Sequence, residues 1–564
     1  MQKSMLKISN YLSLFIVILT VTYFFVRIFF SLDFTDEMQY YGQIQGLLSS
    51  NKLFVNDFFI QQTGYILIYP FLKVIQFFEP QFEFINLIFY TRILLFLIII
   101  CTFLLLFYLS SGYRLFSRII GSCFVSISIT QFSPFAFSYN SLGFLLTSLI
   151  FSFWLFSDSQ YKIIILSTLV LFLGWIYPPQ GILFSLIIVV DFLILKKLND
   201  SIKFIIYLTF LSLIFVLFML GTNFFSINSF IESLYFTQNY PYGFRDISFF
   251  LIIFSSLIVI LSFCFFIIFL HEPKFILFLR KKFNWLFYII SSLFVCAGFY
   301  MIFNKYFWIF SVLFWFASIC VMMLQNLIDQ KNKIILIKIL LSSVLISLTY
   351  GFTSGNSFGV LYRGFFVCIG FLFLVFSSSI ESEKIYKQFY IDILGVIIFL
   401  GLIINIFGKP YRDAYIFDTL YKTKEVHAYN NIFISKIKLD AIEEIKKNIS
   451  IKKNKTLLVL GPHPWIYFAL NAKPNTPYLF MHFLIGNHVR TSKVEKFVID
   501  KIRLSQPDYI IDVIPESSAF FKNNIDIIIK NYSCKEFVVD NKMNNLLEKE
   551  IDFRLPPRIK VCSK

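Results

Sequence analysis

The sequence predicts a polytopic α-helical membrane protein with a small α/β domain at its C-terminus. Hydrophobic residues make up 58% of the 564 residues, and charged residues make up only 15%. Soluble domains average about 45–50% apolar and about 25% charged residues, so this composition excludes an ordinary soluble protein. Apolar stretches of about 20 residues, the length that crosses a bilayer, recur from Tyr11 to Phe407.

The apolar pattern predicts about 13 transmembrane helices. Their expected ranges are 11–30, 84–109, 119–137, 141–156, 163–176, 181–195, 204–225, 247–270, 286–303, 307–328, 334–350, 364–376 and 390–407. The first stretch is too long for a signal peptide alone, and no small-residue cleavage site follows it, so we expect it to remain as the first helix.

The distribution of Lys and Arg predicts a cytoplasmic N-terminus. The inner loops hold Arg114, Arg118, Lys196, Lys197, Lys203, Lys274, Arg280, Lys281, Lys282, Lys331 and Lys333, and the outer loops hold Lys52, Lys73, Arg245, Lys305 and Arg363. This asymmetry follows the positive-inside rule. It places the first loop, residues 31–82, and the C-terminal tail outside a bacterial-type inner (plasma) membrane. The net charge of +17 is spread over loops and tail with no basic-aromatic platform, which favours membrane lipids as partners and not nucleic acid.

The first outer loop carries two adjacent carboxylates, Asp36 and Glu37, in apolar surroundings. A carboxylate at this position suits a general base that takes a proton from an acceptor hydroxyl. The alternative is that acidic residues simply begin a helix. Asp33 and Asp57 are weaker candidates for the base. Residues 44–53 and 65–78 of the same loop are expected to form helices that lie in or re-enter the membrane interface.

The composition changes near Gly408, which divides the chain into residues 1–407 and 408–564. The second part becomes rich in Lys, Asp, Glu and Asn, and its apolar runs are short. Strands are expected at 456–460, 509–513 and 536–539, and a helix is expected at 435–448 with Ser435 as its N-cap. Cys534 and Cys562 are the two cysteines of this polar tail, and their pairing depends on an extracytoplasmic location.

Arginines near the outer ends of two spans are candidates for phosphate binding. Arg92 lies at the outer start of the second span, where a guanidinium suits a donor phosphate. The alternative is that its side chain snorkels to the interface. The same alternatives apply to Arg27, whose position near a helix end favours snorkelling.

Two outer loops late in the chain supply further candidate contacts. In the glycine-rich segment 350–359, Thr353, Ser354 and Asn356 suit hydrogen bonds to a sugar, and Arg363 after it suits a phosphate. The alternative for this segment is a flexible turn, and it lacks the ending of a phosphate-binding P-loop. Lys305 is a second candidate phosphate ligand.

The remaining sequence candidates are aromatic and turn residues. Tyr242, within Tyr240–Arg245, suits stacking on a sugar or anchoring at the membrane interface. The segment Tyr177–Gly181 is expected to be a tight turn. Histidines of the tail are expected to be structural, and the chain contains no CxxC, HExxH or zinc-ligand spacing.

The order of these motifs resembles the GT-C superfamily of membrane glycosyltransferases. One span is followed by an Asp-Glu-x-x-Tyr loop ending at Tyr40, then Gly64–Pro70, then a span entered through Tyr90-Thr91-Arg92. The layout is similar to the branch with protein O-mannosyltransferases and lipid A aminoarabinose transferases. The tail segments Leu458–Tyr467, Asn471–Pro474 and Gln506–Ile511 also resemble the extracytoplasmic domain of that branch.

The resemblance implies transfer of a sugar from a polyprenyl phosphate to a hydroxyl of a lipid, glycan or protein acceptor, with inversion. It implies Asp36 as the catalytic base, Glu37 as a group that positions the acceptor or a divalent cation, and Tyr40 as a sugar or acceptor contact. The chain departs from the family pattern in having Gln39 for an Arg. It also has Asn140 for an Asp after Tyr139, and these two residues are expected to contact sugar or acceptor.

Two other functions remain open from the sequence. A transporter or flippase for lipid-linked glycans would have ionisable residues buried within its spans and paired repeats. In this chain the charges are expected at the edges of the outer loops instead. An O-antigen ligase or polymerase-like enzyme would have its large outer loop late in the chain.

Overall fold

The structure of the protein is a computed structural model. It describes residues 2–54, 59–81, 85–130, 135–222, 224, 226–239, 330–353, 362–378, 392–393, 395–396, 399–400, 403, 416–423, 426–452, 455–474, 492–513, 528–540, 544–547 and 555–564. The spans expected at 247–270, 286–303 and 307–328, and most of the span expected at 390–407, lie outside these residues.

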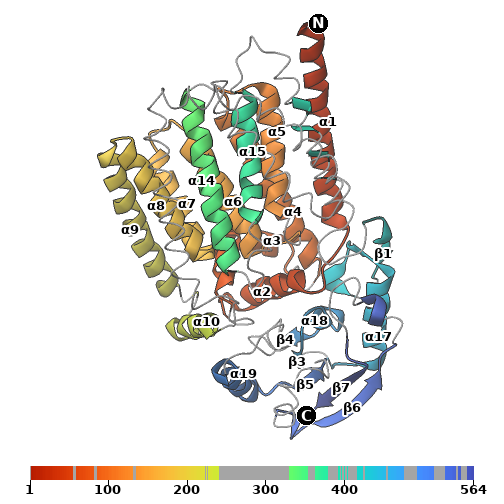
Figure 1. Cartoon of the computed structure of the whole chain (residues 1–564). Coiled ribbons are helices and arrows are strands. Elements are labelled where there is room, and N and C mark those ends of the chain that lie inside the picture. Colours follow the sequence, from red (N-terminus) through yellow and green to blue (C-terminus); the bar gives the residue numbers. More distant parts are fainter. Residues whose placement is uncertain are drawn as a thin grey trace, which may run out of the picture.

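A helical bundle forms the larger part of the described molecule (Figure 1). Its helices are α1 (Gln2–Phe29), α4 (Leu87–Leu109), α5 (Leu115–Thr130), α6 (Tyr139–Phe156), α7 (Lys162–Ile176), α8 (Pro178–Ile194), α9 (Leu198–Gly221), α14 (Gln330–Thr353) and α15 (Tyr362–Ser378). Within the described residues, four helices are long and apolar enough to cross a membrane: Ile8–Phe29, Leu87–Leu109, Tyr139–Phe156 and Leu198–Gly221. These helices are compatible with a membrane location.

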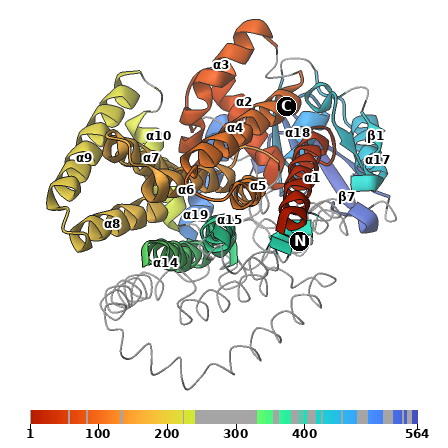
Figure 2. The same ribbon diagram turned by 90° about the horizontal axis from the view of Figure 1, so that it is seen from above.

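Apolar side chains point outward from the edges of the bundle. Seen from above, α8 and α9 form one edge, and α1 lies on the opposite side (Figure 2). In the most apolar part of α9 only 11% of the residues are buried, and side chains such as Phe210 and Leu217 are exposed. An apolar surface of this kind suits contact with lipid chains.

A layer of shorter helices lies across one end of the bundle. It contains α2 (Asp36–Ser50), η1 (Ile60–Leu67) and α3 (Tyr69–Phe78). Figure 1 shows α2 between the bundle and the C-terminal strands. The helix expected to begin at residue 44 begins instead at Asp36, because Asp33 accepts a hydrogen bond from the backbone N–H of Glu37 and so satisfies a donor of the first turn. The helix expected over 65–78 is divided in two by Pro70, which lies in the first turn of α3.

The C-terminal region contains a mixed five-stranded sheet in the order β4-β3-β5-β7-β6. The strands are β3 (Thr456–Leu460), β4 (Lys473–Pro474), β5 (Tyr509–Asp512), β6 (Ser533–Val538) and β7 (Arg558–Ser563). Strand β3 is parallel to β4 and β5, whereas β7 is antiparallel to β5 and β6. Cys534 of β6 is directly opposite Cys562 of β7, and the two form a disulfide.

The described C-terminal region also contains helices and a pair of two-residue strands. The helices are α17 (Lys436–Asn448), α18 (Trp465–Ala469) and α19 (Ser492–Ser505), with the single turns η4 (Ile416–Asp418) and η5 (His427–Tyr429). Ser435 caps α17 by accepting a hydrogen bond from the N–H of Lys438. The strands β1 (Tyr421–Lys422) and β2 (Phe433–Ile434) pair antiparallel, and β2 lies against the end of α1 through the bridge between Phe30 and Phe433.

The bundle also contains ion pairs in which the carboxylate is buried. Asp191 of α8 lies 2.7 Å from Nζ of Lys338 on α14 and accepts a hydrogen bond of 2.9 Å from the indole of Trp154 on α6. Arg114 lies 2.6 Å from Asp392. The expectation that charges gather at the edges of the outer loops is therefore wrong for Asp191 and Lys338. A carboxylate in an apolar bundle is stabilised by a direct cationic partner.

Candidate functional site

A buried ion pair holds α2 against the bundle. Nη2 of Arg92 on α4 lies 2.6 Å from Oε1 of Glu37 on α2. The Arg92 side chain is 0% exposed and the Glu37 side chain is 1% exposed. The hydroxyl of Tyr41, one helical turn after Glu37, donates to the same carboxylate oxygen at 3.0 Å. Burial and the nearby Glu37 carboxylate raise the pKa of Tyr41, so its hydroxyl stays protonated and remains a donor.

The other donors of Arg92 bind the chain where α1 ends. Nη1 donates to the carbonyl oxygens of Arg27 and Ile28 at 3.1 and 3.3 Å, and Nη2 donates to the carbonyl of Ser31 at 2.6 Å. Carbonyls at a helix C-terminus have no partner within the helix, and a guanidinium satisfies several of them at once. Arg92 therefore joins α1, α2 and α4.

This geometry differs from the roles that the sequence predicted for Arg92 and Glu37. The guanidinium of Arg92 neither snorkels to the surface nor presents its N–H groups to a ligand, because protein oxygens surround it. The carboxylate of Glu37 is likewise engaged, since its Oε2 accepts from the N–H of Asp33 at 3.0 Å. In the structure both residues bind other protein groups and hold α2 against the bundle.

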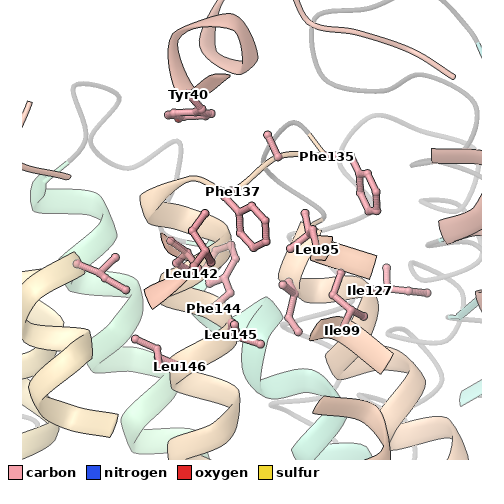
Figure 3. Packing of buried hydrophobic residues seen from close by; sticks show 14 of the residues in the cluster. Tyr40, Leu95, Ile99, Ile127, Phe135, Phe137, Leu142, Phe144, Leu145 and Leu146 are labelled. Atoms are coloured by element: carbon pink, nitrogen blue, oxygen red, sulfur yellow. The ribbon is translucent and has the colours of Figure 1, made fainter. Parts of the chain in front are cut away.

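Asp36 has a different environment from Glu37. It is the first residue of α2 and is half-buried, whereas Glu37 is buried. Successive residues of an α-helix point about 100° apart, and residues four apart share a face, so Asp36 lies on the face of Tyr40. Figure 3 shows Tyr40 on α2 across from the end of the bundle that carries Phe135 and Phe137.

Hydrogen bonds connect this helical layer to the start of α6. The hydroxyl of Tyr41 lies 3.3 Å from the carbonyl oxygen of Phe135. The hydroxyl of Tyr65 on η1 lies 2.9 Å from Oε1 of Gln43 and 3.2 Å from the carbonyl oxygen of Phe137. Tyr139, only two residues further on, begins α6. The layer that carries Asp36 and the start of α6 therefore lie at the same end of the bundle.

Two buried amides lie at this end of the bundle. Asn140 is 5% exposed, and its Oδ1 has no hydrogen-bond partner among the described residues. Gln180, in the first turn of α8, is 0% exposed, and within the described part of the chain neither its Oε1 nor its Nε2 is paired. The ring of Tyr139 stacks on the ring of Tyr177 at 6.1 Å, which brings the two helix starts together.

An unpaired buried amide is costly unless something else satisfies it. The sugar-contact role predicted for Tyr139 and Asn140 remains a prediction, and the structure adds Gln180 as a neighbour of the same kind. The sequence interpretation treated Tyr177–Gly181 only as a tight turn. In the structure only Tyr177 lies between α7 and α8, and residues 178–181 form the first turn of α8. The signal for Gln180 was a lone amide that follows two prolines in an apolar stretch.

The burial of Arg27 is a second result that the sequence interpretation did not give. Its side chain is 4% exposed, so the expectation of snorkelling is wrong. Its guanidinium lies 5.9 Å from the centre of the Phe135 ring, and Nε and Nη1 have no hydrogen-bond partner among the described residues. A buried cation with unused donors suits an anionic ligand group.

The remaining predicted contacts lie outside the described side chains. Lys305, Tyr242, Ser354 and Asn356 are outside the described residues. Thr353 is the last residue of α14 and Arg363 is the second residue of α15, but the structure does not describe their side chains.

The C-terminal region contacts the chain just before Asp36. The ring of Phe34 stacks on the indole of Trp465 at 4.9 Å, and Nζ of Lys438 donates to the carbonyl oxygen of Leu32 at 2.5 Å. The hydroxyl of Tyr429 also reaches Sδ of Met38 at 3.5 Å. The segment that positions Asp36 is thus held from one side by Arg92 and from the other by the C-terminal region.

The acidic groups near α2 do not form a metal site in the described part of the chain. Within it, no group of three or more His, Cys, Asp or Glu side chains is arranged to hold a metal ion. Glu37 is paired with Arg92, and Asp33 accepts from both the N–H and the hydroxyl of Thr35. The donors present here do not fit a divalent cation.

Comparisons with known proteins do not assign the chain to a family, since no family model matches it and no curated protein is significantly similar to it.

Proposed function

We propose that the protein is a membrane glycosyltransferase of the GT-C type, which transfers a sugar from a polyprenyl phosphate to an acceptor hydroxyl. The observation that carries this proposal is the difference in environment between Asp36 and Glu37. Glu37 forms a buried ion pair with Arg92, whereas its half-buried neighbour Asp36 lies on the face of α2 that carries Tyr40. Oδ1 of Asn140 and both amide atoms of Gln180, which have no partner among the described residues, lie at the same end of the bundle.

The proposed reaction requires one base and one cationic group. The carboxylate of Asp36 takes the proton of the acceptor hydroxyl as its oxygen attacks the anomeric carbon. The bond between that carbon and the phosphate oxygen breaks on the opposite face, so the configuration inverts. The polyprenyl phosphate leaves with the bonding electron pair, and a guanidinium stabilises the charge on its oxygens.

Arg27 is the better candidate for that guanidinium among the described arginines. The donors of Arg92 are used by Glu37 and by the backbone at the end of α1, whereas Nε and Nη1 of Arg27 have no partner among the described residues. Lys305 and Arg363 stay predictions for the same role. Tyr139, Asn140 and Gln180 would contact the sugar, with Thr353, Ser354, Asn356 and Tyr242 as further predicted contacts.

The disulfide supports an extracytoplasmic location for the C-terminal region. Disulfides such as Cys534–Cys562 persist in oxidising compartments and are rare in the cytosol. The α2 layer packs against the C-terminal region, so the two would lie on the same side of the membrane. We accordingly propose a cytoplasmic N-terminus, about 13 spans and an outward-facing site in a bacterial-type inner membrane.

Glycan and lipid profiling of a deletion strain tests the proposal. The strain is complemented with wild type, Asp36→Asn, or Asp158→Asn as a control carboxylate outside the site. We expect the product to return with wild type and with the control, and to be absent with Asp36→Asn at equal membrane abundance. Full product with Asp36→Asn would remove Asp36 as the base. Transport of lipid-linked glycans would then gain support, with the buried Asp191–Lys338 pair as its first mutational target.

A further inference from the structure

A cavity lies between α2 and the C-terminal region. Its volume is about 630 Å³, which is within the range of small-molecule sites. Gln45 supplies the wall from α2, and the C-terminal region supplies the other described walls. Gln45 follows Asp36 by nine residues, which corresponds to about half a turn around the helix axis, so the two residues lie on opposite faces of α2.

The described polar lining of this cavity is basic. It includes Lys452, Lys455 and Lys473, and no Asp or Glu. Lys455 is 2.9 Å from the carboxylate of Asp508, so its charge is partly balanced. Among the described residues, Lys452 and Lys473 form no salt bridge. Lys473 is paired in register with Thr456, the residue after Lys455. Lys455 and Lys473 therefore lie at the start of the adjacent strands β3 and β4.

The other described lining residues include both polar and apolar side chains. Asn471 and His427 are polar, whereas Phe468 and Ala472 are apolar. The hydroxyl of Tyr467 accepts from the N–H of Val459 at 2.8 Å, which fixes this aromatic ring in the wall.

The backbone of this wall is also fixed to the bundle. The carbonyl oxygen of His427 accepts from the N–H of Asn86 at 3.0 Å, and Asn86 directly precedes α4. The cavity is therefore built from elements that are held in place before a ligand binds, which lowers the entropic cost of binding.

We propose that this cavity binds a phosphorylated polyol, either a soluble sugar phosphate or the headgroup of an anionic phospholipid. Lys452 and Lys473 bind the phosphate, Gln45 and Asn471 bind hydroxyls, and the ring of Tyr467 packs against the carbon skeleton. Among the described residues neither Lys452 nor Lys473 forms an ion pair with a carboxylate, which suits an anionic ligand, and the polar and aromatic lining residues suit a hydroxylated carbon frame. This inference does not depend on the proposed transfer reaction.

Calorimetric titration of the full chain in phosphatidylcholine nanodiscs tests the cavity directly. The probes are glucose 1-phosphate and, as the uncharged control, glucose. We expect saturable binding of glucose 1-phosphate at low salt, weakening as salt is added, and no measurable binding of glucose. The double variant Lys452→Gln/Lys473→Gln should weaken binding about tenfold or more, because two positive charges that line the cavity are lost.

Two matched variants distinguish the effect of the cavity lysines on affinity from the effect of lysines elsewhere on the protein. Lys447→Gln/Lys535→Gln removes two exposed lysines of the same region outside the cavity and should change the affinity less than about twofold. Lys452→Arg/Lys473→Arg keeps both charges and should bind. Absence of binding by wild type, equal binding of glucose, or an unchanged affinity in Lys452→Gln/Lys473→Gln would each overturn the proposal.

Nanodiscs that contain phosphatidylglycerol identify the source of the ligand. If the lipid headgroup occupies the cavity, phosphatidylglycerol lowers the apparent affinity of wild type for glucose 1-phosphate, and it has no such effect on the residual binding of Lys452→Gln/Lys473→Gln. If the natural ligand is a soluble sugar phosphate, the affinity of wild type is the same in both kinds of nanodisc.

Discussion

Nη2 of Arg92 lies 2.6 Å from Oε1 of Glu37, and this buried pair connects α4 to the first turn of α2. The same guanidinium binds the carbonyl of Ser31 at 2.6 Å. The pair thus fixes where α1 ends and where α2 begins, which determines the position of Asp36. A charge that loses its partner in such a buried environment is strongly destabilising, so the pair can be tested separately from the chemistry.

Glu37→Gln is expected to destabilise the protein by about 3–5 kcal/mol, because it leaves the Arg92 guanidinium buried with a neutral partner. Thermal unfolding of the purified protein in detergent measures the loss. Glu232→Gln is the matched control, since Glu232 pairs with Lys501 at a surface where the side chains are 35% and 28% exposed. The control should change stability by less than about 1 kcal/mol. An unchanged unfolding temperature in Glu37→Gln would contradict the structural role.

Asp36→Asn is expected to give the opposite pattern. Its side chain is half-buried at the first position of α2, so the unfolding temperature should remain close to that of wild type. Product formation should fall by about 10²–10⁴-fold, the usual contribution of a general base. Quantified product in membranes with matched protein abundance measures this effect. If Asp36→Asn lowers both the unfolding temperature and product formation, Asp36 has a structural role like that of Glu37.

Gln180→Leu separates a ligand contact from a structural amide. Neither amide atom of Gln180 is paired within the described chain, so replacing it with an apolar side chain of similar size should leave stability unchanged or slightly raised. If Gln180 contacts the sugar, product formation nevertheless falls. Asn140→Leu should behave in the same way. A fall in the unfolding temperature with no change in product would show that the amide serves the fold.

Trp465→Ala is expected to loosen the contact between the C-terminal region and the loop before α2. Trp465 is 0% exposed and stacks on Phe34, and truncating a buried aromatic side chain costs about 3–5 kcal/mol. Hydrogen exchange of residues 31–37 should become faster in the variant. Phe417→Ala, at a side chain that is 73% exposed, is the control and should leave this exchange unchanged. Equal protection of residues 31–37 in both variants would mean that the contact between Phe34 and Trp465 does not hold the loop.

Asp508 is expected to make stability depend on pH in the acidic range. The N–H of Thr456, the ammonium of Lys455 and the hydroxyl of Thr456 bind its carboxylate and lower its pKa. A depressed pKa in the folded state stabilises the protein above the unfolded pKa of about 3.9, and this stability is lost as the pH falls below that value. Asp508→Asn should cost about 1 kcal/mol near neutral pH and should flatten the acid limb of the unfolding curve. Asp440→Asn, in an exposed pair with Lys436, should leave the curve nearly unchanged.

Composition and local pattern by themselves determined much of the secondary structure. Long apolar stretches gave α1, α4, α6 and α9 because a helix in lipid must satisfy its backbone internally, whatever its neighbours are. The ranges of β3 and α17 also follow from local signals, an apolar run and the N-cap Ser435. The adjacent carboxylates of Asp36 and Glu37 were also visible as a candidate site from the local sequence, because their surroundings are apolar.

Only the tertiary structure shows that Glu37 pairs with Arg92. Arg92 is 55 residues from Glu37 in the sequence, and no local pattern shows that the two meet. The burial of Arg27 and Gln180, and the contact of Phe34 with Trp465, likewise depend on how distant elements pack. A side chain's partners and exposure are properties of the packed molecule, whereas hydropathy and capping are properties of the local sequence.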